Sequence, residues 1–278
     1  MENLSTAYYV FHSVGILMIF SNLVLNLHIL RKFVNDWKTW KKIDYQLFLV
    51  RIILEVINMF AAVNYFVLST VDIFSDIIPY EFIITPGIIA YNFFEARSFL
   101  AAIISVERTL ATTTPIYFYN YRKTISNFPI YIFLITTSIV CNTVLFKVCN
   151  FQFERVDGCA SFYCSLTTCF QSYAVITRII YTSTNIVFST ILSIQLIFLS
   201  CKSTKISSDL QKANLLSLTD AISTFIFDLL PSLIINVRHI EIKSLGPIIG
   251  TLRSTGRLVE SMVVVKLMRK DTSVNQMR

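Results

Sequence analysis

A carboxylate and an arginine stand side by side where one long apolar stretch of the sequence ends. Glu107 and Arg108 are followed by Ala111 and Pro115, three and seven residues after the arginine. A neighbouring carboxylate holds a guanidinium in a charge-assisted pair. Once the pair opens, the guanidinium keeps its charge and offers five hydrogen-bond donors, which suit the negative C-terminal end of a partner helix. The alternative is an ion pair that only ends a membrane helix.

Other charged residues lie within apolar stretches, where a charge is costly and usually faces a bundle interior or a water-filled cavity. Their signs nearly balance, which predicts that they pair with one another inside the protein. Arg51 and Glu55, four residues apart, share one face of a helix. The full set is Arg51, Glu55, Glu95, Arg97, Asp220, Asp228, Arg253, Arg257 and Glu260.

Depth within the expected helices separates two groups of these charges. The outer group lies in the outer to middle third and consists of Glu95, Asp228 and Arg253. The inner group lies in the inner third and consists of Arg51, Asp220 and Glu260. We expect the outer group to line a ligand cavity and the inner group to latch the resting state. The alternative is that both groups only neutralise charge and fix the register of the helices.

Composition shows what kind of element must position these residues. Hydrophobic residues make up 54% of the chain and charged residues 15%, whereas about a quarter of an ordinary soluble domain is charged. The mean hydropathy is +0.63. The chain has too little polar surface for a soluble protein, so we predict an integral membrane protein. The net charge of +7 is better explained by cytoplasmic loops than by binding of nucleic acid.

Seven windows of the sequence hold about 20 mostly apolar residues, the length of a helix that crosses a bilayer. They predict an all-α bundle of seven transmembrane helices, formed as a single domain by residues 1–278. No internal repeat is visible, which weakens the interpretation as a transporter built from inverted halves. The windows are Tyr8–Leu30, Tyr45–Leu68, Pro86–Ala111, Phe128–Val148, Ile179–Ser200, Leu215–Asn236 and Gly246–Met268.

Lysine and arginine predict the orientation, because they concentrate in cytoplasmic loops. If the N-terminus lies outside, the outer loops hold only Arg155, Arg238 and Lys243, and most other positive charges lie inside. We therefore predict an external N-terminus and a cytoplasmic C-terminus. The basic inner loops are expected to attract anionic membrane lipids.

Pro231 interrupts the sixth expected helix. Because proline removes a backbone hydrogen bond and crowds the preceding turn, it should kink this helix. We therefore regard Pro231 as a candidate hinge. The alternative is a proline that the membrane helix merely tolerates.

The sequence has six cysteines, most of which crowd the segment between the fourth and fifth windows. That segment would face the oxidising side of the membrane, where one or two disulfides can form; four thiols allow three pairings. No nearby histidine or paired CxxC accompanies them, so neither a metal site nor another cofactor is predicted. Asn3 begins a glycosylation sequon on the same side. The four crowded cysteines are Cys149, Cys159, Cys164 and Cys169.

The stretch around Glu107 resembles rhodopsin-like receptors. The spacing Glu107-Arg108-x-x-Ala111-x-x-x-Pro115 is similar to their Asp/Glu-Arg-Tyr signature, with Thr109 in place of the tyrosine. The longer segment ISVERTLATTTPIYFYNYRKTISNFP resembles the third helix and second inner loop of nematode serpentine chemoreceptors of class bc. In that class Asn-Tyr-Arg follows the proline, and here these three residues are Asn120-Tyr121-Arg122.

The resemblance implies a chemosensory G-protein-coupled receptor, not an enzyme, in the plasma membrane or the membrane of a sensory cilium. A small odorant or pheromone-like molecule would bind in the outer half of the bundle. A heterotrimeric G protein would bind at the cytoplasmic face. The residues that the resemblance assigns to G-protein coupling and to the latch are Glu107, Arg108, Ala111, Pro115 and Arg122.

Two features depart from the rhodopsin-like pattern. The segment Thr85-Pro86-Gly87 has no cysteine, so the usual disulfide at the top of the third helix cannot form. The seventh window reads Ser261-Met262-Val263-Val264 and lacks an Asn-Pro-x-x-Tyr motif.

A channel or transporter that uses the intramembrane charges as an ion pathway is the alternative function. No His-Glu-x-x-His or comparable motif supports an intramembrane enzyme.

Overall fold

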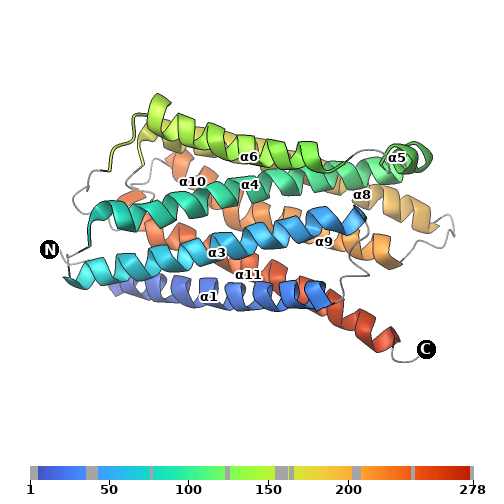
Figure 1. The fold of residues 1–278 in the computed structure, drawn as a ribbon, viewed down its shortest axis with the longest axis horizontal. Coiled ribbons are helices and arrows are strands. Elements are labelled where there is room, and N and C mark those ends of the chain that lie inside the picture. The colour runs from blue at the N-terminus through green and yellow to red at the C-terminus, as the bar shows by residue number, and fades with distance from the viewer. Residues whose placement is uncertain are drawn as a thin grey trace.

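The computed structural model of the protein describes residues 6–35, 43–75, 78–122, 126–153, 162, 166–201, 208–238 and 242–275. The helices are α1 (Thr6–Asn35), α3 (Ile43–Ser75), α4 (Tyr80–Thr113), α5 (Pro115–Arg122), α6 (Phe128–Thr143), η1 (Val144–Val148), α8 (Thr168–Cys201), α9 (Ser208–Thr224), η2 (Phe225–Leu229), α10 (Leu230–Arg238) and α11 (Ile242–Asn275). Because the described residues form helices and no strand, the all-α prediction is confirmed. The long helices run along one axis, and α1 begins at the opposite end of the bundle from the end of α11 (Figure 1).

Six helical segments of the described chain are long and apolar enough to cross a membrane, and the protein is a multi-pass membrane protein. Helix α11 is as long as α4 and α8, but it carries Arg253, Arg257 and Glu260 and is less apolar than these six segments. It contains the expected seventh window and packs along α1 and α9. That α11 crosses the membrane as a seventh span stays a prediction, as does the orientation of the termini.

Most helices extend beyond the windows read in the sequence, and two of the earlier starts bear on the candidate site. Helix α4 begins at Tyr80 rather than Pro86, and α8 begins at Thr168 rather than Ile179. Both extensions contain polar residues, which end an apolar window although a bundle interior can satisfy them. A third difference is α5, which forms where the sequence predicted a loop. Its first residue is Pro115, whose fixed backbone angle suits the first turn of a helix.

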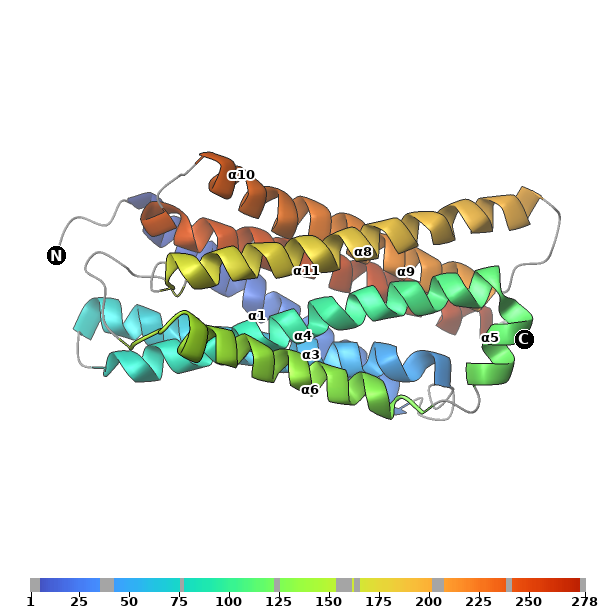
Figure 2. The ribbon, with the colours of Figure 1, turned by 90° about the horizontal axis from the view of Figure 1, so that it is seen from above.

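Helix α4 lies at the centre of the bundle and α6 at its edge. Helix α4 packs against α3, α6, α8 and α9, and 56% of its most apolar window is buried, against 17% for the segment that contains α6. Figures 1 and 2 show α6 on the outside of the bundle beside α4. Residues of α4 can therefore meet side chains from most other helices, whereas α6 presents residues such as Phe133 and Ile135 to the surroundings.

A wide π-helical turn, η2, ends two residues before Pro231 in the sixth expected span. Proline cannot donate a backbone hydrogen bond and its ring crowds the preceding turn, so a widened turn relieves the clash. The Ser232 hydroxyl donates to the backbone oxygen of Asp228 at 2.7 Å, which satisfies one carbonyl of this turn. The wide turn marks a place where the helix can bend, and the hinge role of Pro231 stays a prediction.

Close packing of η2 on α11 depends on Gly256. A β-carbon on Gly256 would lie 2.7 Å from Cβ of Phe227, closer than such atoms approach without movement of the backbone. We expect Gly256→Ala to lower the free energy of unfolding by about 1–3 kcal/mol, the usual cost of overpacking. Thermal unfolding of the purified protein measures this loss.

Gly250→Ala is the matched control, since its β-carbon would meet only Cζ of Phe66 at 3.7 Å, an ordinary contact. Both substitutions gain the same helix propensity. Equal melting temperatures for the two variants would show that η2 and α11 are not packed closely at Gly256.

Candidate functional site

Charged side chains from four helices meet at the centre of the bundle and form what we call the inner cluster. Its members are at most 7% exposed. Arg97 lies at the middle of α4, so the cluster sits deep inside the bundle rather than at one end. The inner cluster consists of Arg51 and Glu55 on α3, Arg97 on α4, Asp220 on α9, and Arg257 and Glu260 on α11.

Arg97 contacts every carboxylate of the inner cluster. Its Nε atom lies 2.6 Å from Oε2 of Glu55. Its Nη2 atom lies 2.6 Å from Oε2 of Glu260 and 3.5 Å from Oδ1 of Asp220. A planar guanidinium can hold several oxygens at fixed angles, which suits it to this shared position. Arg97 therefore joins α3, α9 and α11 to the central helix α4.

Arg51 and Arg257 complete the inner cluster from two sides. Arg51 Nη2 lies 2.6 Å from Oδ1 of Asp220 and also pairs with Glu260. Arg257 Nη1 lies 3.5 Å from Oε2 of Glu260 and 3.7 Å from Oδ1 of Asp220. The structure thus brings together all three residues of the predicted inner group. Arg51 pairs with other helices rather than with Glu55, its neighbour on α3.

The inner cluster is balanced, because its arginines and carboxylates are equal in number. Burial of a single charge costs several kcal/mol, and pairing with good geometry offsets that cost. Removal of one member leaves a buried charge without compensation. This lowers the stability of the protein much more than replacement of an arginine together with a carboxylate. The cluster therefore favours the arrangement of helices that keeps all its members together.

Neutral polar side chains extend the inner cluster to α1. Asn22 Nδ2 donates to Oε1 of Glu55 at 3.1 Å. The Ser261 hydroxyl donates to Oδ1 of Asn22 at 2.7 Å, and Asn26 Nδ2 donates to the Ser261 oxygen at 2.9 Å. Asn22 and Ser261 are fully or almost fully buried. These bonds fix α1 against α3 and α11 in one register.

A second extension reaches α8. Asn185 Nδ2 donates to Oδ2 of Asp220 at 2.9 Å. Farther along, the hydroxyls of Ser189 on α8 and Ser217 on α9 lie 3.0 Å apart. Together with the α1 contacts, this makes a buried polar network that runs through the bundle from α1 to α8. Sequence reasoning did not predict these asparagines and serines as partners of the charges, although Asn22 resembles the polar asparagine in the first helix of receptors and the pairs Asn22/Asn26 and Asn185/Ser189 repeat a polar residue after four positions.

A small cavity adjoins the inner cluster beside Asn26, Arg51, Glu55, Arg97 and Glu260. It has room for about one water molecule. Its polar walls offer such a molecule several hydrogen-bond partners. The cavity is too small for an odorant, so a site for such a ligand has to be sought elsewhere in the bundle.

A second group of polar side chains, the outer cluster, lies nearer the end of the bundle at which α1 begins. Oδ1 of Asp228 lies 2.8 Å from Nε of Arg253 and 3.3 Å from Nε of Arg178. Arg178 Nη1 also donates to the Ser232 hydroxyl at 2.9 Å. The outer cluster consists of Glu95 on α4, Arg178 on α8, Asp228 on η2, Ser232 on α10 and Arg253 on α11.

Of the predicted outer group, the structure pairs Asp228 with Arg253 but leaves Glu95 apart from both. Glu95 is 3% exposed, and among the described residues it forms no ion pair within 4.0 Å. Glu95 is therefore a buried carboxylate with capacity for a further hydrogen-bond donor.

Arg178 is the residue of this site that sequence reasoning missed. The fifth window begins at Ile179, so Arg178 counts there as the end of a span. In the structure α8 begins at Thr168, and Arg178 lies about three turns inside it and is 3% exposed. A signal exists in the sum of intramembrane charges. With Arg178 the five arginines inside the bundle match the five buried carboxylates, whereas without it one carboxylate is in excess.

Glu107 and Arg108 lie half-buried in the last two turns of α4. Thr109 stands where the resemblance expects a tyrosine, and its buried hydroxyl lies 2.9 Å from the backbone oxygen of Phe188 on α8. The Thr112 hydroxyl donates to Oε1 of Gln195 at 2.6 Å. These contacts fix the end of α4 against α8 and hold the neighbouring arginine near the end of the bundle.

The other residues that the resemblance assigns to G-protein coupling come after Arg108 in the sequence, at the end of α4 and in α5. Ala111 is half-buried near the end of α4, and Pro115 is exposed and begins α5. Arg122 is the last residue of α5, and its side chain lies outside the described part of the structure. The coupling roles of these residues stay predictions.

A disulfide joins Cys149 to Cys169, with the two Cα atoms 5.5 Å apart. It ties the end of η1 to the start of α8. Cys159 and Cys164, the other cysteines of this segment, lie outside the described residues, as does the predicted glycosylation site at Asn3. Within the described residues, no group of three or more potential metal ligands occurs.

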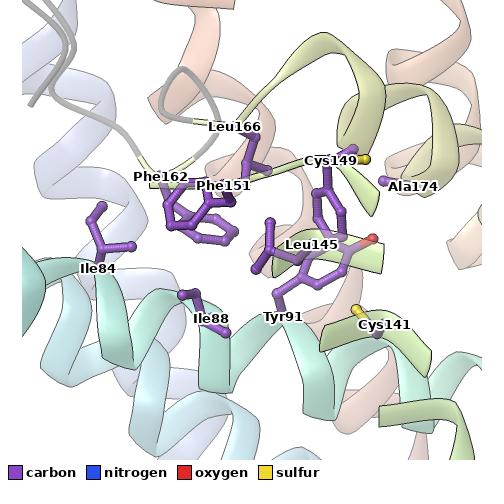
Figure 3. Close-up of a cluster of buried hydrophobic side chains, with 11 residues drawn as sticks. Ile84, Ile88, Tyr91, Cys141, Leu145, Cys149, Phe151, Phe162, Leu166 and Ala174 are labelled. Carbon is purple, nitrogen blue, oxygen red and sulfur yellow. The ribbon is translucent and has the colours of Figure 1, made fainter. Parts of the chain in front are cut away.

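Aromatic and aliphatic side chains pack beside this disulfide at one end of the bundle (Figure 3). Phe162 contacts the position of a β-carbon on Gly87 at 3.0 Å, and its backbone N–H donates to the Tyr65 hydroxyl at 2.5 Å. Tyr91 packs edge-on against Phe170, with ring centroids 5.3 Å apart. Phe162 thus reaches α4 near Thr85-Pro86-Gly87, where no cysteine is available to anchor a loop.

Comparison with known proteins places these features in one family. A search of curated proteins found no match to this chain. The family model described as serpentine type 7TM GPCR chemoreceptor Srbc matches residues 4–272, almost the whole chain. The match agrees with the helical membrane bundle and with the resemblance found around Glu107. The chain therefore belongs to the Srbc family of serpentine 7TM GPCR chemoreceptors.

Proposed function

We propose that this chemoreceptor binds a small odorant or pheromone-like molecule at the outer cluster and activates a heterotrimeric G protein at the other end of the bundle. The observation that carries the proposal is its membership of a chemoreceptor family over residues 4–272. The proposal includes an external N-terminus, α11 as the seventh span, and a place in the plasma or sensory-cilium membrane.

The outer cluster supports the ligand site, because small-molecule sites combine mostly apolar walls with a few placed polar groups. Arg178, Asp228 and Arg253 provide charges of both signs, and Glu95 can accept a further hydrogen bond. Phe94 on α4 provides an aromatic wall beside these arginines. A ligand with a polar group would exchange contacts with this set.

The end of α4 supports the G-protein site. Half-buried Glu107 and Arg108 lie at the end of the bundle opposite the start of α1, the end that is cytoplasmic in the predicted orientation. In the resting state Glu107 restrains Arg108. In the active state Arg108 binds the C-terminal end of a Gα helix, whose dipole is negative there.

The inner cluster supports a latch between the two sites. A ligand shifts a conformational equilibrium only by its difference in affinity for the two states. The ion pairs of Arg51, Asp220 and Glu260 join α3, α9 and α11, and we assign them to the resting state. Rearrangement at the wide turn before Pro231 would let the inner end of α9 move. An ion pathway is less well supported, because these buried charges already pair with one another.

An agonist screen tests the ligand site. Cells that express the receptor with a promiscuous Gα subunit are exposed to small odorants, and any active compound is titrated against Arg253→Gln and Asp228→Asn at matched surface expression. We expect at least a tenfold loss of potency in each variant, because loss of one hydrogen bond to a charged group costs about 1.5–3 kcal/mol.

Arg31→Gln is the control, since Arg31 is exposed on α1 far from the outer cluster. Equal potency on the control and on both site variants would show that the ligand does not contact the outer cluster. Activation of the G protein by that compound would still support the receptor function.

A further inference from the structure

Three arginine side chains converge on one aromatic ring in the middle of the bundle. Phe94 on α4 is 9% exposed. The guanidinium carbons of Arg178, Arg253 and Arg257 lie 5.5, 5.5 and 5.3 Å from the centre of its ring. Each distance is within the range of a cation–π interaction, which is strongest where water is excluded. Phe94 therefore interacts with α8 and α11 through charge as well as packing.

These arginines do not belong to one cluster. Arg178 and Arg253 pair with Asp228 in the outer cluster, at 3.3 and 2.8 Å. Arg257 lies one turn farther along α11 than Arg253 and approaches Glu260 at 3.5 Å in the inner cluster. The ring of Phe94 thus contacts guanidinium groups from both clusters.

The arrangement holds like charges close together, so it depends on the carboxylates on both sides. Arg253 and Arg257 both lie beside the ring of Phe94 and repel each other, and the repulsion is stronger in a low-dielectric interior. Asp228 compensates the first charge, and Glu260 with Asp220 compensates the second. If Asp228 lost its contacts with Arg178 and Arg253, the ring of Phe94 would change its position, and the contacts of Arg257 would change with it.

We propose that Phe94 is a positioning residue that couples the outer cluster to the inner cluster. Displacement of the guanidinium groups of Arg178 and Arg253 moves the ring. The moved ring shifts Arg257 relative to Glu260. This inference rests on the proposed function only where it assigns the displacement of Arg178 and Arg253 to a ligand. The coupling between the clusters is a property of the folded chain. It gives the two sites a shared two-state element, which is the physical requirement for allosteric coupling.

A mutant cycle measures this coupling without ligand or G protein. Apparent melting temperatures are determined in lipid nanodiscs for Asp228→Asn, Glu260→Gln and their combination. Effects of independent sites add, whereas coupled sites deviate from the sum. We expect the combined shift to differ from the sum of the single shifts by about 2–4 °C in the wild-type background. This deviation from additivity is the readout because it separates coupling from packing. If Phe94 only filled space, its loss would change the stability of the protein but would not change how the two shifts combine.

The same cycle is then repeated in Phe94→Leu and Phe94→Tyr. Leucine keeps an apolar side chain but has no aromatic face, whereas tyrosine keeps that face. We expect additive shifts in the leucine background and wild-type deviation in the tyrosine background. The same deviation in Phe94→Leu as in the wild type overturns the proposal. If Phe94→Leu does not fold, Arg257→Lys serves instead, because lysine keeps the charge and lacks the planar guanidinium; additive shifts are expected there too, and an unchanged deviation overturns the proposal.

The result separates the two proposals. A chain with coupled clusters that never activates a G protein contradicts the proposed function and leaves the role of Phe94 intact. A chain that signals normally but shows additive shifts in the wild-type background overturns the role of Phe94 alone.

Discussion

Arg108→Ala is expected to abolish activation of the G protein, whereas Glu107→Gln is expected to raise activation in the absence of ligand. The first variant removes the guanidinium that would bind the Gα helix. The second removes the charge that would restrain it in the proposed resting state. Because the pair is only half-buried, its net contribution is about 1 kcal/mol, so basal activation should rise by roughly three- to tenfold.

The measurement is nucleotide exchange on the G protein in membranes with matched amounts of receptor. Lys147→Ala is the matched control, because Lys147 is an exposed positive residue in η1, outside α4. Its basal and stimulated rates should equal those of the wild type. If both α4 variants also signal like the wild type, Glu107 and Arg108 do no more than end a membrane helix.

Arg97→Met is expected to lower the stability of the receptor more than Gly256→Ala does. Arg97 contacts Glu55, Glu260 and Asp220 within 3.5 Å. Without it, buried carboxylates exceed buried arginines in the inner cluster, and an uncompensated buried charge costs about 3–5 kcal/mol. We expect a lower melting temperature in detergent or lipid and less receptor at the cell surface.

Arg31→Met controls for the loss of a positive charge, because Arg31 is exposed on α1; its effect should stay within about 0.5 kcal/mol. Addition of Glu55→Gln to Arg97→Met restores the charge balance of the inner cluster. The double variant should therefore recover at least half of the lost stability. Equal stability of Arg97→Met and Arg31→Met would mean that the inner cluster does not stabilise this fold.

Much of the architecture could be predicted from hydrophobicity, because apolar windows of membrane length are hard to produce by chance. The near balance of intramembrane charges also predicted that the inner group would pair. Arg51, Asp220 and Glu260 come from helices far apart in the sequence, yet a buried charge needs a partner wherever the chain can supply one.

What the sequence did not predict depends on rotation and depth of the helices. Arg178 was missed because an apolar window stops at the first polar residues, whereas α8 continues past them into the bundle. Counting residues from the outer end of each expected helix also placed the outer and inner groups of charges farther apart than the structure does. Glu95 and Arg97 lie two residues apart on α4, so one turn of helix connects the clusters. The position of Phe94 between them follows from packing, for which a single sequence carries no signal.

The shared partners of the inner cluster have a consequence for how such a receptor can evolve. Glu260 contacts Arg51, Arg97 and Arg257, and each of these arginines also contacts Asp220. A mutation at one position is corrected only in part by one reciprocal mutation, because the balance of charge returns while the other shared contacts stay broken. Selection then acts on the cluster as a set, and its positions are expected to be kept or replaced together while the surrounding apolar surface drifts freely.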